Sequence, residues 1–201
     1  MITTIVFDLG GVLIDWNPEY LYRKIFQQEA EMLQFFENIC TPDWNEEQDA
    51  GRSLREATEM LVERFPEHEE NIRAYYGRWE EMLGGAIQGT VEIFRELKEM
   101  DRFKIYALTN WSAETFPIAT KRFDFLGWFD GIVVSGEEKN RKPFPDFYHL
   151  LLNRYQVQAE ESLFIDDNLR NIEAARAIGM QTIHFKSPTQ LRNELLEKGI
   201  L

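Results

Sequence analysis

The stretch Ile5-Val6-Phe7-Asp8-Leu9-Gly10-Gly11-Val12-Leu13 decides how this chain folds. An apolar run ends in a carboxylate, and two glycines follow, so we predict a buried strand that ends at Asp8 and continues into a tight loop. Ligands of open α/β sheets bind at the carboxyl ends of the strands, where a carboxylate can act as a nucleophile or a metal ligand. Taken alone, Asp8 could equally be a turn-forming residue. A similar stretch at Phe164-Ile165-Asp166-Asp167-Asn168 favours a functional site.

The composition excludes several classes of protein. The chain has 201 residues, 44% of them hydrophobic, which is enough for a substantial core. Its formal net charge of −13 disfavours nucleic acid and anionic membranes as partners. The single cysteine, Cys40, cannot form an internal disulfide, and no basic, apolar leader or long apolar span is recognisable. We therefore expect a soluble cytoplasmic protein.

Residues 17–83 have a helical pattern. Asn17-Pro18 predicts a helix start, Ser53 to Glu56 forms a capping box, and Pro66 should end that helix. A further helix is predicted over 69–83, whereas Thr41-Pro42-Asp43-Trp44 is interpreted as a loop. This acidic, aromatic block is predicted to be an inserted helical bundle.

After residue 84 the pattern alternates between strands and helices, which is typical of parallel pairing with right-handed crossovers. We predict an α/β fold with a doubly wound, Rossmann-like parallel sheet as its core and an α-helical bundle as its cap. The core should comprise residues 1–15 and 88–201, and the cap residues 16–87. The expected strands after the first are 104–108, 132–134, 163–165 and 181–184, and the expected helices span 91–100, follow Ser112, begin at Pro145, span 169–178 and begin near Ser187.

Polar side chains follow four of the predicted strands, and the sheet should gather them at one edge. Three carboxylates, two hydroxyls, an amide and a lysine suit a hard cation together with a phosphoryl group. Each residue alone has a simpler interpretation, such as a helix cap or a solvated loop lysine, but their shared placement favours a site. The set comprises Asp8, Thr109, Asn110, Ser135, Lys142, Asp166 and Asp167.

In these segments the chain resembles the haloacid dehalogenase-like (HAD) hydrolase superfamily, in the subfamily with a helical cap after the first strand. The resemblance covers essentially the whole chain, and four motifs occur in the family's order. They are Phe-Asp-Leu-Gly-Gly-Val at 7–12, Leu108-Thr109-Asn110, Arg141-Lys142-Pro143 and Phe164-Ile165-Asp166-Asp167-Asn168.

The resemblance implies a role for each phosphate-site residue. Asp8 would attack phosphorus and form an aspartyl-phosphate, which water then hydrolyses. Thr109 and the backbone amide of Asn110 would bind the phosphoryl oxygens. Lys142 would pair with both the phosphate and the Asp8 carboxylate.

The resemblance also implies a magnesium site. Asp167 would hold Mg²⁺, directly or through water, and Asp8 and the backbone carbonyl of Gly10 would be further ligands. Asp166 and Asn171 would support the site from nearby.

One position departs from the family's pattern. Family phosphatases usually carry an aspartate two residues after the nucleophile, where it serves as acid and then as base, but this chain has Gly10. General acid–base catalysis is typically worth about 10²–10⁴-fold in rate. The Asp-x-Gly variant is similar to sugar-1-phosphate phosphatases, so easier leaving groups or an acid from elsewhere are expected. Asp15 is the nearest later carboxylate, although it lies where the chain enters the cap.

The cap should set substrate choice. Its candidates are Trp16, Trp44 with its segment 41–44, and the segment Gln48-Asp49-Ala50-Gly51-Arg52. Aromatic rings can stack on a sugar, and Gly51 allows a tight turn near the site. The two tryptophans could equally just pack the cap, and Trp111 could line the pocket or pack.

We expect a magnesium-dependent phosphatase that hydrolyses a small phosphorylated metabolite, with a sugar phosphate as one candidate. A 2-haloacid dehalogenase would use the same aspartate without a metal, which the Asp166-Asp167 pair disfavours. A phosphomutase is disfavoured because return transfer would profit from the acid that Gly10 lacks. A catalytically weak binding or regulatory protein is the alternative outside enzymes. Both a monomer and a homodimer remain open.

Overall fold

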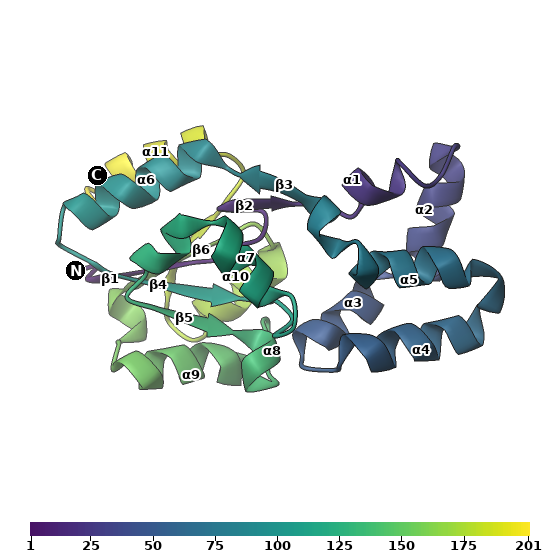
Figure 1. Ribbon diagram of the computed structural model, residues 1–201. Helices are drawn as coiled ribbons and strands as arrows, with labels where there is room; N and C mark the ends of the chain where they lie inside the picture. The colour runs from purple at the N-terminus through teal and green to yellow at the C-terminus, as the bar shows by residue number, and fades with distance from the viewer.

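A parallel five-stranded sheet forms the centre of the molecule. The computed structural model describes all residues, Met1–Leu201, and orders the strands β5-β4-β1-β6-β7 (Figure 1). All four pairings in this sheet are parallel, which confirms the predicted doubly wound fold. The strands are β1 (Thr4–Phe7), β4 (Lys104–Thr109), β5 (Gly131–Val134), β6 (Ser162–Asp166) and β7 (Gln181–His184).

The sheet is buried on both faces. Successive side chains of its strands point alternately into two apolar clusters, one on each face. In β1, Ile5 and Phe7 belong to the larger core cluster, whereas Val6 belongs to the smaller one. This two-residue period places successive side chains on opposite faces. Helices α6 (Gln88–Glu99) and α11 (Pro188–Glu197) pack against the larger cluster, and α9 (Pro145–Tyr155) and α10 (Leu169–Ala177) pack against the smaller one.

A two-stranded antiparallel ribbon joins the core to the helices beyond it. It consists of β2 (Ile14–Trp16) and β3 (Leu83–Ala86), and the sequence analysis did not predict it. The ribbon lies close to the predicted boundaries at 16 and 87, and the division into core and cap stays a prediction. Helices of the segment between the two strands lie to one side of the sheet in Figure 1, namely α1 (Glu19–Tyr22), α2 (Glu29–Asn38), α3 (Pro42–Asp49), α4 (Leu54–Arg64) and α5 (Glu69–Gly77).

Two predictions about this helical segment were wrong. The helix expected over 69–83 ends at Gly77, and a 3₁₀ turn (Trp79–Met82) leads into β3. The segment 41–44 is not a loop but the start of α3, because the Thr41 hydroxyl accepts a hydrogen bond from the Trp44 N–H and Pro42 occupies the first helical position. By contrast, the Ser53 cap is confirmed, since its hydroxyl accepts from the Glu56 N–H.

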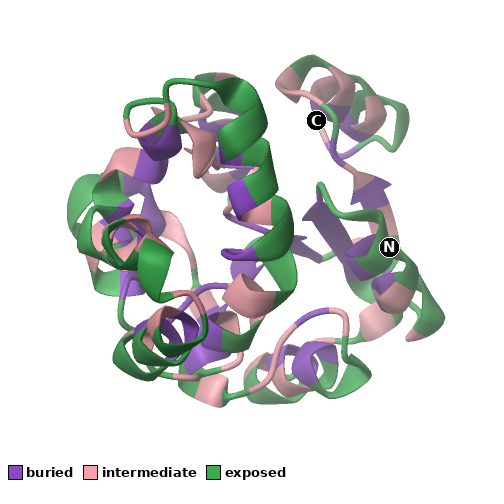
Figure 2. Ribbon diagram, turned by 90° about the vertical axis from the view of Figure 1, so that its right-hand side faces the viewer, coloured by how far each residue is buried: buried purple, intermediate pink, exposed green.

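Aromatic side chains hold the helical segment together. Tyr22 is fully buried and lies against Phe26, Phe35, Phe36 and Tyr75. Figure 2 shows buried residues on the inner faces of these helices and exposed residues on the outer faces. The same apolar cluster continues into the sheet, so both parts of the molecule share one core.

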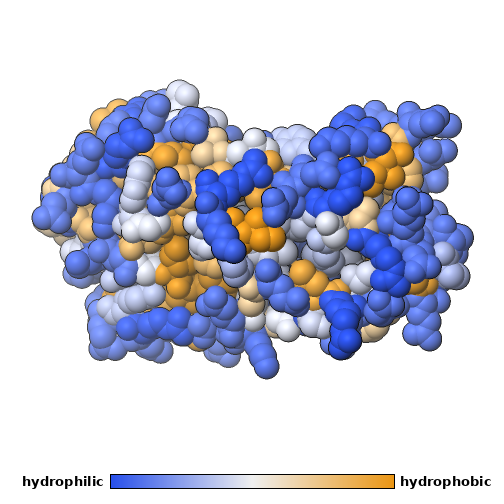
Figure 3. Space-filling model, viewed as in Figure 1, coloured by the Kyte–Doolittle hydropathy of each residue, from blue (hydrophilic) through white to orange (hydrophobic).

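The face shown in Figure 3 is mainly hydrophilic, with hydrophobic residues gathered in smaller patches. This fits a chain with 35 acidic and 22 basic side chains. None of the helices combines the length and the apolar character that crossing a membrane requires.

Phe94 gives a test of the larger core. Its ring is fully buried, stacks on Phe129 with centroids 4.4 Å apart and tilts against Phe7 at 5.7 Å. We predict that Phe94→Ala lowers the free energy of unfolding by about 3–5 kcal/mol, because it removes this burial and leaves a cavity. Urea unfolding measures the change. The exposed Met60→Ala should stay within about 0.5 kcal/mol of wild type, and equal losses in both variants would contradict the packing described.

Candidate active site

Asp8 lies at the point of the sheet where the order of the strands reverses. It directly follows β1, which is flanked by β4 on one side and β6 on the other, and its N–H donates to the Ile165 carbonyl at 2.8 Å. The chain winds outward from β1 toward β5 and then returns to wind toward β7, so a crevice opens at the carboxyl end of β1. Asp8 is 8% exposed and faces this point.

Lys142 joins two carboxylates below the crevice. Its Nζ lies 2.9 Å from Asp8 Oδ1 and donates to Asp166 Oδ2 at 2.7 Å. Lys142 and Asp166 are both fully buried. A lysine that is taken out of water in this way needs such partners, because an unpaired buried charge is very costly.

Asp166 is fully engaged by neighbouring donors. Besides Lys142, it accepts from the Asn168 N–H at 2.8 Å and from Asn171 Nδ2 at 3.1 Å. Its geometry is that of a residue that orients Lys142 and the loop after β6. The supporting role predicted for Asp166 and Asn171 stays a prediction.

The crowding of these charges shifts their pKa values. Burial raises the pKa of Asp8 and the carboxylates of Asp166 and Asp167 add to the rise, although Lys142 opposes it. Burial followed by Asp166 likewise raises the pKa of Asp167. Burial alone would lower the pKa of Lys142, but Asp166 and Asp8 raise it above its ordinary value, so the lysine stays cationic. The three carboxylates therefore face too little positive charge, since Lys142 is the one cation among them.

The acidic cluster has the donor set and spacing of a divalent metal site. Carboxylate oxygens of Asp8, Asp166 and Asp167 lie within 4.8 Å of one another. Gly11 leaves room for Asp167, since a Cβ at Gly11 would lie 2.3 Å from Asp167 Oδ2, and its φ of +73° suits glycine. Three oxygen donors with one lysine leave a surplus of negative charge, so the residues fit Mg²⁺.

Thr109 presents a hydroxyl without a partner. Its residue is fully buried at the end of β4, and Oγ1 has no hydrogen-bond partner in the protein. Buried hydroxyls are nearly always paired, so this one is available for a ligand. Asn110 beside it is held by Lys142, since its Nδ2 donates to the Lys142 carbonyl at 3.0 Å and its Oδ1 accepts from the Lys142 N–H at 2.9 Å.

Ser135 is part of the loop scaffold. Its fully buried hydroxyl accepts from the Trp111 N–H at 2.9 Å and donates to the Trp111 carbonyl at 3.4 Å. The neighbouring Gly136 packs directly on this loop, where a Cβ would lie 2.4 Å from the Ala113 nitrogen. Ser135 therefore shapes the loop after β4, and its hydroxyl is already in use.

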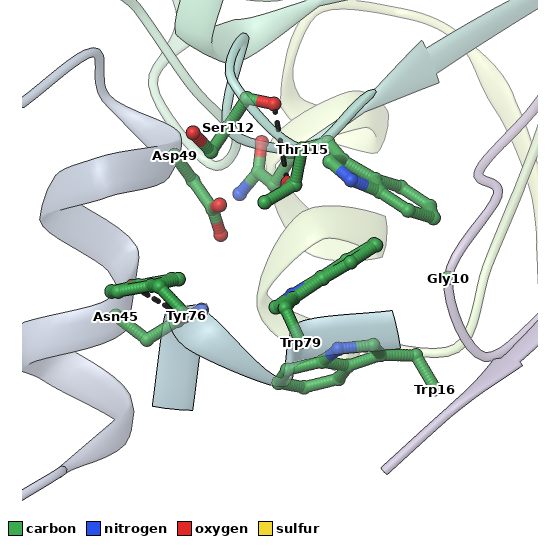
Figure 4. A pocket seen from close by; sticks show the side chains of 10 residues that line it. Gly10, Trp16, Asn45, Asp49, Tyr76, Trp79, Ser112 and Thr115 are labelled. Carbon is green, nitrogen blue, oxygen red and sulfur yellow. Dashed lines mark hydrogen bonds between the residues drawn. The ribbon is translucent and has the colours of Figure 1, made fainter. Parts of the chain in front are cut away.

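A cavity of about 450 Å³, partly open to solvent, lies between the sheet edge and the helical segment (Figure 4). Trp16 and Trp111 line it, and the indole N–H of each is buried without a partner. Aromatic faces and free donors suit a ligand that has both apolar and polar surface. The full lining comprises Gly10, Trp16, Asn45, Asp49, Tyr76, Trp79, Asn110, Trp111, Ser112 and Thr115.

Two candidates lie elsewhere. Trp44 packs against Tyr75 and Tyr76 at 5.1 and 5.4 Å between ring centroids, and its indole donates to the Ala57 carbonyl. Asp15 accepts a 2.7 Å hydrogen bond from the Tyr20 hydroxyl. Neither lines the cavity.

The sequence analysis did not single out Trp79, Tyr76 or Asn45 as lining residues. Helical spacing made the two aromatic residues indistinguishable from packing residues. Asp49 was named only within a longer segment. Its place on the turn of α3 before Gly51, whose φ is +99°, was the available signal.

The sequence model of the haloacid dehalogenase-like hydrolase family matches residues 2–179. The chain belongs to this family. It is 28% identical over 180 residues to a sesquiterpene phosphatase of Aspergillus oryzae, with 90% of this chain and 88% of the relative covered. It is also 28% identical over 190 residues to a phosphorylated carbohydrates phosphatase of Thermotoga maritima, with 90% and 83% covered. These similarities support a hydrolase of phosphatase type.

A solved structure shares the fold of this HAD-like hydrolase. It is a HAD family enzyme from Bacteroides thetaiotaomicron in complex with magnesium and inorganic phosphate, with a TM-score of 0.69 and 22% identity. The match covers 93% of this chain and 96% of that one. The match to the family model confirms the recognition of the family from four short motifs.

Asp167→Asn tests the metal site without measuring activity. In metal-free buffer we expect the variant to unfold at higher urea than wild type, because it removes one of three crowded carboxylates. Mg²⁺ should stabilise wild type, by about 2.7 kcal/mol at a hundred times its Kd, and leave the variant nearly unchanged. Asp101→Asn is the control, since the exposed Asp101 lies at the opposite end of β4 and has a φ of 51° that asparagine tolerates. An equal Mg²⁺ response in Asp167→Asn would argue against this site.

Proposed function

We propose that this HAD-like hydrolase is a magnesium-dependent phosphatase that acts on a small phosphorylated metabolite through an aspartyl-phosphate. The unpartnered Thr109 hydroxyl carries the proposal, because it offers a donor to an anion at the end of β4, the strand that pairs with β1 and so neighbours Asp8. The carboxylate cluster supplies the place for a cation, and Lys142 supplies a second positive charge. Together they suit a phosphoryl group in an otherwise acidic protein.

Each residue then has one task. Thr109 Oγ1 and the Asn110 N–H bind the transferring oxygens, and Lys142 pairs with the phosphate while it keeps Asp8 oriented. Asp8 attacks phosphorus, the bond to the leaving-group oxygen breaks, and water later releases phosphate from Asp8. Asp8, Asp167 and the Gly10 carbonyl would hold Mg²⁺, which neutralises phosphate charge when it is bound. Asp166 and Asn171 hold Lys142 and the loop in place.

The cavity indicates the class of substrate. Trp16, Trp79, Trp111 and Tyr76 supply aromatic surface, and the two free indole N–H groups supply donors. Hydroxyls of a sugar would accept these hydrogen bonds while a ring face stacks. A sugar phosphate is therefore our first candidate, in line with the relative that is named for phosphorylated carbohydrates. A cytoplasmic location and the choice between monomer and homodimer stay predictions.

The first experiment is phosphate release from p-nitrophenyl phosphate with and without Mg²⁺. We expect turnover that depends on Mg²⁺ and a loss of at least about 10³-fold in Asp8→Asn, because the amide is no nucleophile. The exposed Asp43→Asn is a matched control that should keep wild-type turnover. No release by wild type would favour a binding or regulatory protein, and metal-independent chloride release from a 2-haloacid would favour a dehalogenase.

Trp16→Phe tests the substrate class. It keeps an aromatic ring and removes the buried indole N–H that has no partner. For a sugar phosphate we expect KM to rise about 5–10-fold, equivalent to one hydrogen bond of about 1 kcal/mol, with kcat little changed. Trp44→Phe should leave KM unchanged, since Trp44 lies outside the cavity. Steady-state kinetics across a panel of phosphorylated metabolites measures both, and equal KM values for wild type and Trp16→Phe throughout would exclude this contact.

A further inference from the structure

Asp49 is a carboxylate that the cap places in the cavity. It is the last residue of α3, it lines the same cavity as Gly10 and Asn110, and its side chain extends into that cavity (Figure 4). Asp49 is thus the one carboxylate among the residues that line the cavity, and it does not belong to the metal cluster.

Ion pairs with the core fix the helix that carries Asp49. Glu46, one turn earlier on α3, lies 2.8 Å from Arg141 Nη1 and 2.6 Å from Arg170 Nη2. Arg141 is only 14% exposed and directly precedes Lys142. At the other side of Asp49, Gly51 packs on α8 (Ser135–Glu138), where a Cβ would lie 3.3 Å from the Gly136 carbonyl oxygen.

The surroundings of Asp49 favour a proton at neutral pH. Burial, then Glu46, raises the pKa of Asp49 to about 7, while Arg141, Lys142 and the Ser112 backbone oppose the rise. The other titratable groups that face it are the hydroxyls of Tyr75 and Tyr76, whose own pKa values are raised mainly by burial. A carboxyl group of this kind can give up a proton and take one back near pH 7.

We infer that Asp49 is the general acid and base of the reaction, a role for which Gly10 has no side chain. The inference rests on the proposed phosphatase function. In the first step, Asp8 Oδ bonds to phosphorus, the bond from phosphorus to the ester oxygen breaks, and the Asp49 proton moves to that oxygen. In the second step, the Asp49 carboxylate takes a proton from the water that attacks phosphorus. Phosphate leaves, and Asp8 and protonated Asp49 are regenerated.

Gly10 allows the reciprocal experiment. A Cβ at Gly10 would meet no atom within 4 Å, and its φ lies outside the left-handed region. An aspartate can therefore be placed at position 10 without strain. If Asp49 does the work of the missing aspartate, Gly10→Asp should make Asp49 dispensable.

The experiment compares an alkyl phosphate with p-nitrophenyl phosphate at saturating Mg²⁺. For Asp49→Asn we expect kcat on the alkyl phosphate to fall about 10²–10⁴-fold, because its leaving group needs a proton. With p-nitrophenyl phosphate we expect a burst of one p-nitrophenolate per site and slow turnover after it, because only the water step then lacks its base. Gly10→Asp in the Asp49→Asn background should restore turnover of the alkyl phosphate.

The controls separate chemistry from structure. Glu47→Gln changes the same charge on the exposed side of α3 and should keep wild-type kinetics. Asp49→Glu keeps a carboxyl group and should keep the alkyl phosphatase pH limb near 7, which Asp49→Asn should lose. Wild-type kcat in Asp49→Asn, or an equal loss on both esters without burst or rescue, would overturn the inference. Absence of wild-type activity on p-nitrophenyl phosphate would instead overturn the proposed function, and the inference with it.

Discussion

The buried pairing of Lys142 with Asp8 and Asp166 is the constraint on which the site depends. Taking a lysine fully out of water is costly, and two carboxylates at 2.9 and 2.7 Å compensate for it. Breaking such a buried pair typically costs about 3–5 kcal/mol. The three residues come from the ends of β1 and β6 and from the loop before α9, so this pairing also holds distant segments in register. The same ion pairs therefore stabilise the fold and orient Asp8.

The remaining polar groups are arranged around this pairing. Asn110 exchanges two hydrogen bonds with the backbone of Lys142, so the loop after β4 is linked directly to the segment that carries the lysine. Ser135 holds the next residue of that loop, Trp111. These contacts leave the Thr109 hydroxyl free, together with Asn171 Oδ1 and the two indole N–H groups of the cavity. A hydroxyl left unpaired within so well-paired a network is costly, which is why we interpret it as a ligand contact.

Much of the core was predictable from the sequence because the hydrophobic pattern and the polar residues at the strand ends indicate the same strands. Each strand is a short apolar run followed at once by a polar residue, and parallel strands bring those residues to one edge. Asp8, Thr109, Lys142 and Asp166 could be grouped on that basis alone. The ribbon of β2 and β3 could not, since Leu83-Gly84-Gly85-Ala86 lacks the alternation of a strand, and its pairing depends on chain segments nearly 70 residues apart. Likewise, no local pattern distinguishes Trp16, which lines the cavity, from Trp44, which packs inside the cap.

The structure also changes how Gly10 is understood. From the sequence, a glycine in place of an aspartate meant a lost function. In the fold, α3 forms the opposite wall of the cavity that Gly10 lines. Asp49 lies on this helix, and Glu46 of the same helix forms ion pairs with Arg141 and Arg170 of the core. A catalytic group on the cap has a consequence that one on the core lacks. The position of Asp49 depends on the ion pairs of Glu46 with Arg141 and Arg170, which link α3 to the core. A substrate that breaks these ion pairs would therefore bind without a correctly placed acid. Substrate choice and proton transfer would then be governed by the same few contacts.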